Sequence, residues 1–374
     1  MKVALLVPGG VDRTGTHRVI PCLLWMIERL VAAGDEVHVF AMRQEPEPGR
    51  WPLLGAQIHN AGRRPRRTRM LLQLAAEHRR GRFDVLHALW IEQGLVAAAA
   101  RCIHGTPILL HLPGGDVTAL PEIGYGARLT LRGGLSVRLA TGAAARVVAP
   151  SNYVVGQAAA LGITAERVPF GVALDRWPPR LPRRRTPAEP ARLLHVGSLN
   201  PVKDQDTLLR SAARLAAGGV DFSLDVIGQD TLGGAVQRRA AEMGLGQAVR
   251  FRGFLPHDEL RPWVDRADLL LVTSRHEAGP LVLLEAAVAG VPTAGTRVGH
   301  LADWAPDACA AVAVGDADGL AAAVGCLLLD EDARLRMAER AQALALAEDA
   351  DWTARRIREI YAEIVEGRRG GGGE

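Results

Sequence analysis

The chain has 374 residues, 48% of them hydrophobic and 23% charged, which excludes extended disorder and predicts two domains of ordinary size. Its 45 basic and 41 acidic residues are too evenly balanced to indicate a nucleic-acid-binding protein. We expect no secretory leader and no bilayer-spanning segment, and the four cysteines lack metal-ligand spacing. These features predict a globular protein of a reducing cytoplasm.

The first half of the chain alternates between short apolar runs and helix-length segments. Residues 2–7 are an apolar run typical of a strand buried on both faces, and two glycines follow it. Apolar residues then recur at helical spacing over residues 17–33. Further strands are predicted at residues 36–42, 84–88, 107–112 and 146–149. This repeated βα pattern predicts a doubly wound parallel sheet, a Rossmann-like domain over residues 1–177.

The pattern stops at residues 178–191, where five prolines and four arginines indicate a linker. It then restarts, with strands predicted at residues 192–196, 222–227, 249–251, 268–273 and 291–294. A second Rossmann-like domain is therefore expected over residues 192–350. A helical pattern covers residues 330–366. We expect its last part, residues 351–366, to return to the first domain, and residues 367–374 to form a disordered tail.

The loop at residues 273–280 is the most informative candidate site, because ligands of open parallel sheets bind beyond the carboxyl ends of the strands. Gly279 is predicted as the N-cap and Pro280 as the first residue of a helix over residues 281–289. Free amides and the helix dipole make such a helix start an anion site.

Two glutamates flank this helix start. Glu277 lies in the loop before it and Glu285 on the helix, and spacing alone fits a solvated loop residue and an exposed helix residue equally well. The stretch EAGPLVLLEA resembles the E-x7-E motif of the retaining glycosyltransferases of family 4. By this resemblance Glu277 contacts the donor sugar and Glu285 binds the ribose of the nucleotide. Gly279, Pro280 and Leu281 then lie near the diphosphate.

The stretch HVGSLNPVKDQDTLL, which begins at His195, carries a second part of the resemblance. Members of the family usually have an arginine after Gly197 and a lysine five or six residues further on, and both hold the diphosphate. Lys203, one of only two lysines in this chain, takes the lysine position. Ser198 replaces the arginine and can donate one hydrogen bond. The alternative for Lys203 is an ordinary surface lysine.

The resemblance covers nearly the whole chain. Residues 227–260 are similar to the family's base-binding segment, in which backbone near Arg252 would read the base. Gly9 and Gly10 fit the family's glycine loop beside the donor phosphates, although a tight βα turn explains them equally well.

Two histidines of the first half receive different interpretations. His111 ends a predicted strand and aligns with a family histidine near the reacting centre, which favours a catalytic role. His87 is interpreted as a structural or supporting residue. The family's usual Asn-Gly-Val-Asp reads Phe170-Gly-Val-Ala here, which is a departure from the pattern.

Eight arginines lie between Arg63 and Arg82. They indicate either a solvated basic surface or a patch that contacts an anionic acceptor or, peripherally, the inner face of a membrane. Asp204 and Asp316 belong to D-x-D sequences, but each begins a predicted helix, where aspartate caps. No metal site is therefore expected, and no cofactor beyond a nucleotide-sugar co-substrate.

The resemblance implies a GT-B architecture of two facing domains with a cleft between them. It also implies transfer of a sugar from a nucleotide-diphosphate sugar to a hydroxyl of a small-molecule, saccharide or lipid-linked acceptor, with retention of anomeric configuration. A sugar-nucleotide epimerase of the same architecture and a non-catalytic sugar-nucleotide-binding protein stay open. A dinucleotide-dependent dehydrogenase is disfavoured, because VPGGVDRTG lacks G-x-G-x-x-G.

Overall fold

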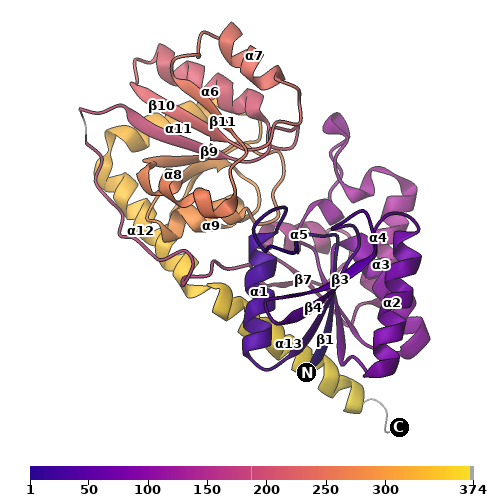
Figure 1. Cartoon of the computed structure of the whole chain (residues 1–374). Helices are drawn as coiled ribbons and strands as arrows, with labels where there is room; N and C mark the ends of the chain where they lie inside the picture. Colours follow the sequence, from indigo (N-terminus) through magenta and orange to yellow (C-terminus); the bar gives the residue numbers. More distant parts are fainter. Residues whose placement is uncertain (187, 371–374) are drawn as a thin grey trace. The chain divides into compact units, whose positions relative to one another are not determined.

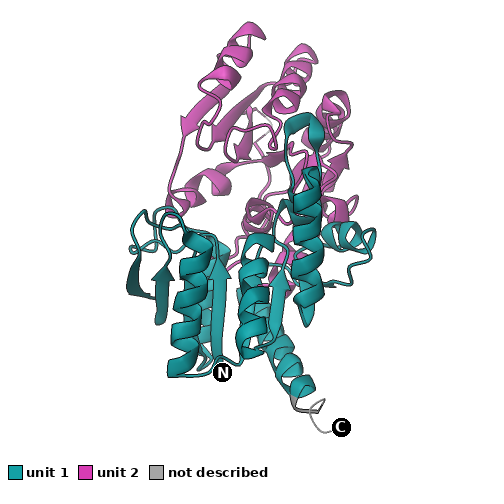
Figure 2. Ribbon diagram, turned by 90° about the vertical axis from the view of Figure 1, so that its right-hand side faces the viewer, with its two compact units in different colours: residues 1–171, 350–374 teal, residues 172–349 magenta. Residues whose placement is uncertain are grey.

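The computed structural model describes residues 1–186 and 188–370, which form two compact α/β units (Figure 1). Unit 1 comprises Met1–Gly171 together with the C-terminal segment that starts at Ala350, and unit 2 comprises Val172–Asp349 (Figure 2). Unit 1 thus ends before the predicted boundary at residue 177, and the predicted linker belongs to unit 2. The last helix runs to Gly370, through part of the predicted tail, whose residues 371–374 lie outside the described residues.

Unit 1 is built on an eight-stranded sheet in the order β3-β4-β2-β1-β5-β6-β7-β8. Neighbouring strands are parallel except for the antiparallel pair of β3 and β4. The strands are β1 (Lys2–Val7), β2 (Glu36–Ala41), β3 (Gly49–Leu53), β4 (Ala56–Asn60), β5 (Val85–Leu89), β6 (Ile108–His111), β7 (Arg146–Ala149) and β8 (Glu166–Arg167). The predictions missed β3, β4 and β8, because these strands are short and contain no continuous apolar run.

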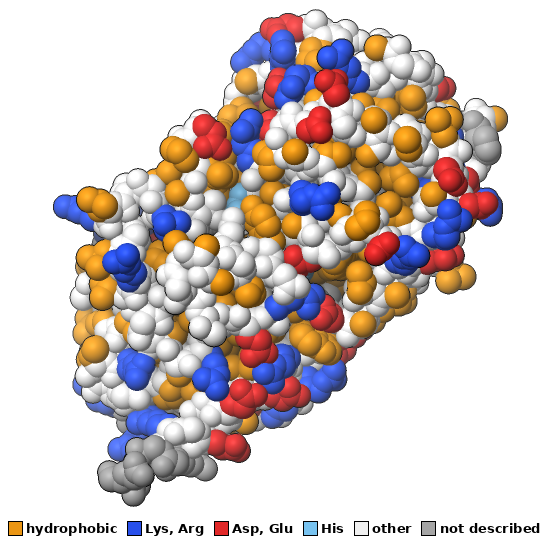
Figure 3. All heavy atoms as spheres, turned by 180° about the vertical axis from the view of Figure 1, so that it is seen from behind, with side chains coloured by type: hydrophobic (Ala, Val, Ile, Leu, Met, Phe, Trp, Pro, Cys, Tyr) orange, Lys and Arg blue, Asp and Glu red, His pale blue; other side chains and the backbone are white. Residues whose placement is uncertain are grey.

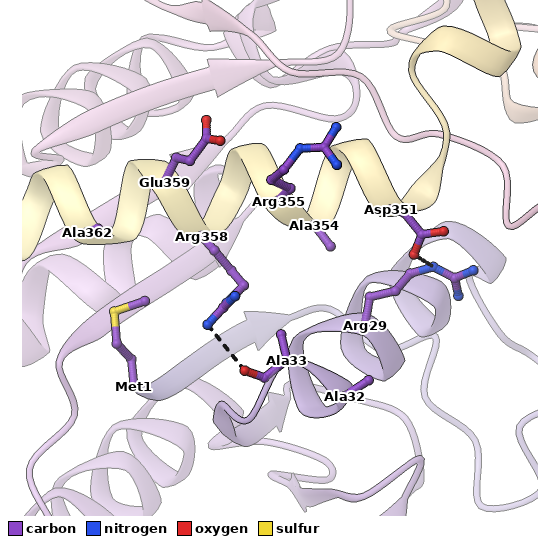
Figure 4. A pocket seen from close by; sticks show the side chains of 10 residues that line it. All are labelled: Met1, Arg29, Ala32, Ala33, Asp351, Ala354, Arg355, Arg358, Glu359 and Ala362. Atoms are coloured by element: carbon purple, nitrogen blue, oxygen red, sulfur yellow. Dashed lines mark hydrogen bonds and ion pairs between the residues drawn. The ribbon is translucent and has the colours of Figure 1, made fainter.

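The helices of unit 1 are α1 (Pro21–Ala32), α2 (Arg66–Arg80), α3 (Ile91–His104), α4 (Leu131–Ala143), α5 (Asn152–Ala159) and α13 (Ala350–Gly370). The first and the last of them, α1 and α13, bury apolar side chains in one core with the sheet. The last of these, α13, packs against α1 although the two are far apart in sequence: Arg29 bonds Asp351 at 3.0 Å, and Arg358 donates to the carbonyl of Ala33 (Figure 4). The pocket between α1 and α13 in Figure 4 is lined by these paired side chains.

Unit 2 contains a six-stranded, fully parallel sheet in the order β11-β10-β9-β12-β13-β14. Its strands are β9 (Ala191–Val196), β10 (Phe222–Ile227), β11 (Val249–Gly253), β12 (Leu269–Val272), β13 (Thr293–Thr296) and β14 (Ala310–Val312). Its helices are α6 (Gln205–Ala217), α7 (Ala235–Glu242), α8 (Arg261–Arg266), α9 (Leu281–Val288), α10 (His300–Trp304), α11 (Ala317–Leu329) and α12 (Glu331–Ala347). The predictions missed β14, which has three residues, and joined α12 and α13 into one helix.

The predicted linker is held by unit 2. Arg180 donates its backbone N–H to Val288, Gln342 donates to the carbonyl of Arg180, and Arg183 pairs with Asp268 at 2.9 Å. The predicted fold class is confirmed, since each unit is a doubly wound α/β layer structure around a mainly parallel sheet.

Charged groups of both signs are distributed over the surface. On the face drawn in Figure 3, basic and acidic side chains are interspersed, with hydrophobic side chains between them. Within residues 1–186 and 188–370, none of the helices has the length and hydropathy that crossing a membrane would require.

Candidate functional site

Two loops of unit 2 meet at the carboxyl edge of its sheet. They follow β9 and β12, which are neighbours in the sheet, so both loops leave from the same edge. The hydroxyl of Thr273 donates to the carbonyl of Lys203 at 2.9 Å, and the N–H of Arg275 donates to the carbonyl of Val202 at 2.7 Å. These bonds fix the two loops to each other and place Lys203 opposite Glu277.

Lys203 and Glu277 form the ion pair at the centre of this edge. Lys203 Nζ lies 2.5 Å from Glu277 Oε1, and the hydroxyl of Ser274 donates to the same oxygen at 2.5 Å. The Lys203 chain passes alongside Gly197, where a Cβ would lie 3.4 Å from it, an ordinary van der Waals distance. A cation and a carboxylate are thus held together, partly exposed, beyond the ends of β9 and β12.

The backbone before α6 is shaped to present Lys203. The side-chain carbonyl of Asn200 accepts the N–H groups of Val202 and Lys203 at 3.0 and 3.1 Å. Asp204 adopts φ +47° and caps α6 by accepting the N–H of Thr207. Asp316 caps α11 in the same way. The interpretation of these two aspartates as helix caps is therefore confirmed.

Glu285 is buried on α9, and the reading of it as an exposed helix residue is wrong. Its side chain is 3% exposed, and its Oε1 lies 2.5 Å from Nε2 of His257. Trp177 donates its ring N–H to the backbone carbonyl of Glu285 at 2.9 Å and lies beside His257, with ring centroids 5.4 Å apart. A buried carboxylate is costly unless it is bonded, and His257 supplies that bond.

Sequence reasoning missed His257, Ser274 and Trp177. His257 lies in the segment compared with the family's base-binding region, but no spacing rule links it to Glu285. Only 4% of the residues are aromatic, and Trp177 is one of seven tryptophans. This scarcity is the only sequence feature that points to Trp177 as a residue that anchors the helix of Glu285.

The start of α9 differs from the prediction by one residue. Pro280 is the N-cap, with φ −67° and ψ 114°, and Leu281 is the first helical residue. The predicted assignment of Gly279 as N-cap and Pro280 as first residue is wrong, because Pro280 keeps an extended ψ. No side chain caps this helix start. The N–H of Leu283 donates to the carbonyl of Pro280 at 3.1 Å. A helix start without a side-chain cap suits an anionic ligand.

Ser198 follows β9 and Arg252 lies near the end of β11, and β10 separates these two strands in the sheet. The carbonyl of Ser198 accepts a bond from Gln205 at 3.2 Å. Arg252 is held by Asp225 on β10 at 2.7 Å, and its guanidinium lies 4.9 Å from the centroid of the Trp263 ring. The Arg252 side chain is thus held by Asp225 and Trp263. The predicted reading of the nucleotide base concerns the backbone around Arg252 and not this side chain.

A buried histidine lies beneath the ion pair. His195, on β9, shares a hydrogen bond between its Nδ1 and the carbonyl of Leu271 at 3.0 Å. Burial lowers the pKa of His195 to about 4, so the ring is neutral at pH 7. His195 therefore adds no charge to the site.

The glycine loop of unit 1 is closed by a glutamine. Gln44 Oε1 accepts the N–H groups of Gly10 and Val11 at 2.6 and 3.0 Å. Gly10 has φ +85°, and a Cβ there would lie 2.6 Å from the Ile20 side chain. The tight turn by itself accounts for glycine at position 10; Gly9 precedes it and also lies against Gln44.

His111 is fully buried at the end of β6. Its ring stacks on Phe170, with centroids 4.3 Å apart, and on His87, with centroids 5.8 Å apart. Burial holds the pKa of His111 well below its usual range, so the ring is neutral. Phe170, the departure from the family pattern, therefore packs directly on the histidine that the resemblance places near the reacting centre. His87 bonds the hydroxyl of Tyr361 on α13 at 2.7 Å, as a structural residue would.

The basic segment of residues 63–82 is partly neutralised inside unit 1. Arg66 and Arg67 both pair with Glu92, at 3.1 and 2.9 Å, and Arg80 pairs with Glu77 at 2.5 Å. The described part of the chain contains no group of three or more His, Cys, Asp or Glu side chains arranged to hold a metal ion.

Comparisons with known proteins assign the chain to a family. Residues 181–344 match the family "Glycosyl transferases group 1" and residues 19–171 match "Glycosyl transferase 4-like domain". D-inositol 3-phosphate glycosyltransferase 1 of Catenulispora acidiphila is 30% identical over 322 residues, 78% of this chain and 74% of that protein. Glycogen synthase of Mycobacterium tuberculosis is 34% identical over 203 residues, 53% of this chain, and the match spans about half, 48%, of that protein.

Solved structures of low sequence identity share the fold. Sucrose-phosphate synthase of Thermosynechococcus elongatus superimposes with a TM-score of 0.83 at 19% identity, over 98% of this chain and all of that one. HepE of Anabaena, solved in complex with UDP-glucose, gives a TM-score of 0.76 at 17% identity, over 97% of this chain and 100% of that one. The chain therefore belongs to the group 1 glycosyltransferases, of the family-4 type with the GT-B fold, as the sequence motifs predicted.

Proposed function

We propose that the protein transfers a sugar from a nucleotide-diphosphate sugar to an acceptor hydroxyl, with retention of anomeric configuration. The observation that carries this proposal is the Lys203–Glu277 ion pair, which joins the loop after β9 to the loop that leads to α9, whose start has no side-chain cap. A cation and free helix amides suit a diphosphate, and carboxylates suit sugar hydroxyls. HepE, which shares the fold, was solved with UDP-glucose, which supports a donor of this chemical class.

Lys203 and Glu277 pair with each other in the structure. We infer that a bound diphosphate takes the place of Glu277 as the partner of Lys203. Glu277 is then free to accept hydrogen bonds from the donor sugar, while Ser274 keeps it in position. As the sugar–phosphate bond breaks, negative charge grows on the leaving diphosphate, and Lys203 with the α9 amides stabilises it.

Glu285 is proposed to bind the ribose. Its carboxylate is buried but retains an acceptor oxygen besides the one bonded by His257, so it can accept ribose hydroxyls without reorganisation. Because no side chain in the site is an obvious nucleophile, we propose front-face displacement, in which the leaving diphosphate takes the acceptor proton.

The test is a screen of UDP-, GDP- and ADP-sugars by nucleotide release, run with and without candidate hydroxyl acceptors. We expect nucleotide release to depend on the presence of an acceptor. The glycosidic linkage of the product should have the same anomeric configuration, axial or equatorial, as the donor sugar. Formation of an epimeric sugar nucleotide without acceptor would establish the epimerase alternative. Tight donor binding with no turnover under any acceptor would establish a non-catalytic binding protein.

Metal independence is part of the proposal. The charges of the diphosphate are met by Lys203 and helix amides, and the two D-x-D aspartates, Asp204 and Asp316, cap helices. We expect full activity after exhaustive treatment with EDTA. Loss of activity that Mn²⁺ or Mg²⁺ restores would show that the phosphate site needs a metal.

The acceptor side is proposed only as a class, a small-molecule, saccharide or lipid-linked hydroxyl compound. A peripheral contact of residues 63–82 with an anionic acceptor or membrane stays a prediction. The exposed Arg63, Arg64 and Arg82 support it, whereas the pairing of Arg66 and Arg67 with Glu92 reduces the charge available. A cytoplasmic location also stays a prediction.

A further inference from the structure

The helix α4 of unit 1 presents leucines to solvent. Leu131 is 96% exposed, Leu135 57% and Leu139 55%. Residues four apart lie on one face of a helix, so these three side chains form a continuous stripe, the α4 leucine stripe. Val137 and Ala140, on the opposite face, are buried in unit 1.

The stripe has no role in folding unit 1. Thr130 caps α4 by accepting the N–H of Gly133 at 3.0 Å, and the helix packs on α3 through its other face (Figure 1). Leu129, 37% exposed in the turn that precedes the helix, extends the apolar surface. Single exposed leucines are common, but an aligned set on the outward face of one helix is typical of an interaction surface.

The charged residues of α4 and of the turn just before it are all positive. At 100° per residue, Arg132 and Arg138 lie on either side of the leucines, and both are exposed. Arg128, also exposed, comes just before the helix. The sequence contains neither Asp nor Glu between Glu122 and Glu166. A partner of this face must therefore be apolar at its centre and negatively charged around it.

We propose that the outward face of α4 binds the surface of a bilayer that contains anionic phospholipid. The leucines would enter the boundary between headgroups and acyl chains, and Arg128, Arg132 and Arg138 would contact lipid phosphates. A second copy of the chain fits less well, because a two-fold contact through this face brings the same arginines together. The proposal concerns attachment and is independent of the sugar-transfer reaction.

Flotation with vesicles tests the proposal, with phosphatidylcholine alone and with phosphatidylcholine mixed with phosphatidylglycerol. We expect the full-length protein to bind the mixed vesicles, to release from them at high salt, and to bind neutral vesicles at least about tenfold more weakly. The triple variant Leu131→Gln, Leu135→Gln, Leu139→Gln should lose binding about tenfold or more. Arg132→Gln with Arg138→Gln should lose the preference for phosphatidylglycerol.

Matched exposed residues on other helices serve as controls. Leu329→Gln with Leu344→Gln, at side chains 90% and 43% exposed, and Arg336→Gln with Arg355→Gln should bind like the wild type. Calorimetry on each variant checks folding, which substitutions at exposed positions should preserve.

Three results would overturn the proposal: no binding of the wild type to mixed vesicles, unchanged binding of the leucine variant, or equal binding to neutral vesicles. Light scattering adds a fourth. If the wild type is a dimer that the leucine variant dissociates, while neither binds vesicles, the stripe is a contact between copies.

Discussion

Lys203 carries the only lysine charge of unit 2, and its Nζ lies 2.5 Å from Glu277. A cation directed at a leaving diphosphate acts mainly in the transition state, so we expect Lys203→Ala to lower kcat/KM by about a hundredfold. Lys203→Arg should recover only part of this, because a planar guanidinium has a different reach from an ammonium. Ser198, in place of the family's arginine, leaves Lys203 with less redundancy.

The other lysine of the chain is the matched control for this prediction. Lys2 lies in unit 1 and pairs with Glu36 at 2.8 Å, so Lys2→Ala should leave kcat/KM unchanged. Steady-state kinetics on the three variants decide the matter. Wild-type kcat/KM in Lys203→Ala would mean that the diphosphate is held elsewhere.

The two glutamates should separate binding from turnover. Glu285 is buried and held by His257, so we expect Glu285→Ala to weaken binding of the free nucleotide by about tenfold or more, the effect of losing hydrogen bonds to a charged group. Glu277→Ala should leave that affinity within about twofold and lower turnover, since its proposed partner is the sugar. Titration calorimetry with the free nucleotide measures both. Equal affinity in the wild type and Glu285→Ala contradicts the ribose assignment.

The sequence could single out Glu277, Glu285 and Lys203 as candidate site residues because they belong to a spaced motif and follow predicted strands. His257 and Ser274 escaped it because their contacts are set by tertiary structure. The burial of Glu285 could not be predicted either, since exposure of a helix residue depends on which neighbours cover it. A carboxylate on an otherwise apolar helix hinted that Glu285 has a special role, but periodicity could not decide whether its side chain is buried or exposed.

Among the elements, α3 has a start that is sensitive to pH. Asp116 Oδ1 accepts the N–H of Ile91, the first residue of α3, at 2.9 Å, and burial raises the pKa of Asp116 to about 6. The folded protein therefore binds the proton of Asp116 more tightly than the unfolded chain does. The stability that it contributes is present below about pH 4, the ordinary pKa of an aspartate, and is lost as the pH rises through about 6.

Titration of Asp116 should lower the unfolding free energy of the wild type by about 2 to 3 kcal/mol between pH 4 and pH 7. Asp116→Asn, which is neutral at every pH, should lack this contribution. Urea unfolding of the wild type and the variant across this range measures it. Asp316→Asn, at the exposed cap of α11, controls for the loss of a carboxylate cap alone. Parallel pH profiles for the wild type and Asp116→Asn would show that Asp116 does not titrate in this range.

Elements were predictable in proportion to their burial. The strands β1 and β5 are mainly apolar runs covered on both faces, and each lies within a residue of its predicted bounds. The hairpin of β3 and β4 alternates polar and apolar residues over five positions each, too short to distinguish from a loop. The break between α12 and α13 was hidden because helical spacing continues across it.

At the scale of the whole molecule, the repeated βα pattern was enough to predict two parallel sheets, because such connections allow few topologies. The order of the strands was not predictable, since periodicity says which residues are buried but not which strand lies beside which. The return of the chain to unit 1 rests on the packing of α13 against α1 and on the contact of Tyr361 with His87.

Buried histidines make the stability of the protein sensitive to acid. In unit 1, burial lowers the pKa of His59 and of His87 to about 3 and holds that of His111 far below its usual range. In unit 2, burial lowers the pKa of His195 to about 4. Each ring stays neutral in the folded protein, whereas in the unfolded chain it gains a proton below about pH 6.5. Stability is therefore complete above pH 6.5 and is lost as the pH falls.

We expect His59, His87 and His111 to lower the unfolding free energy of unit 1 by about 4 kcal/mol between pH 8 and pH 5.5, about 1.4 kcal/mol for each ring. His104, whose pKa burial lowers to about 4, adds to this loss. Asp116 offsets about 1 kcal/mol of it, because its protonation favours the folded state. Calorimetry across this pH range, with hydrogen exchange to assign the transition of unit 1, should show its melting temperature falling as the pH falls. His59→Phe, whose ring can stack on Phe40 as the imidazole does at 4.6 Å, should reduce the loss by about 1.4 kcal/mol. If the transition of unit 1 does not shift with pH, or shifts equally in His59→Phe, the neutral histidines of unit 1 do not control its acid stability.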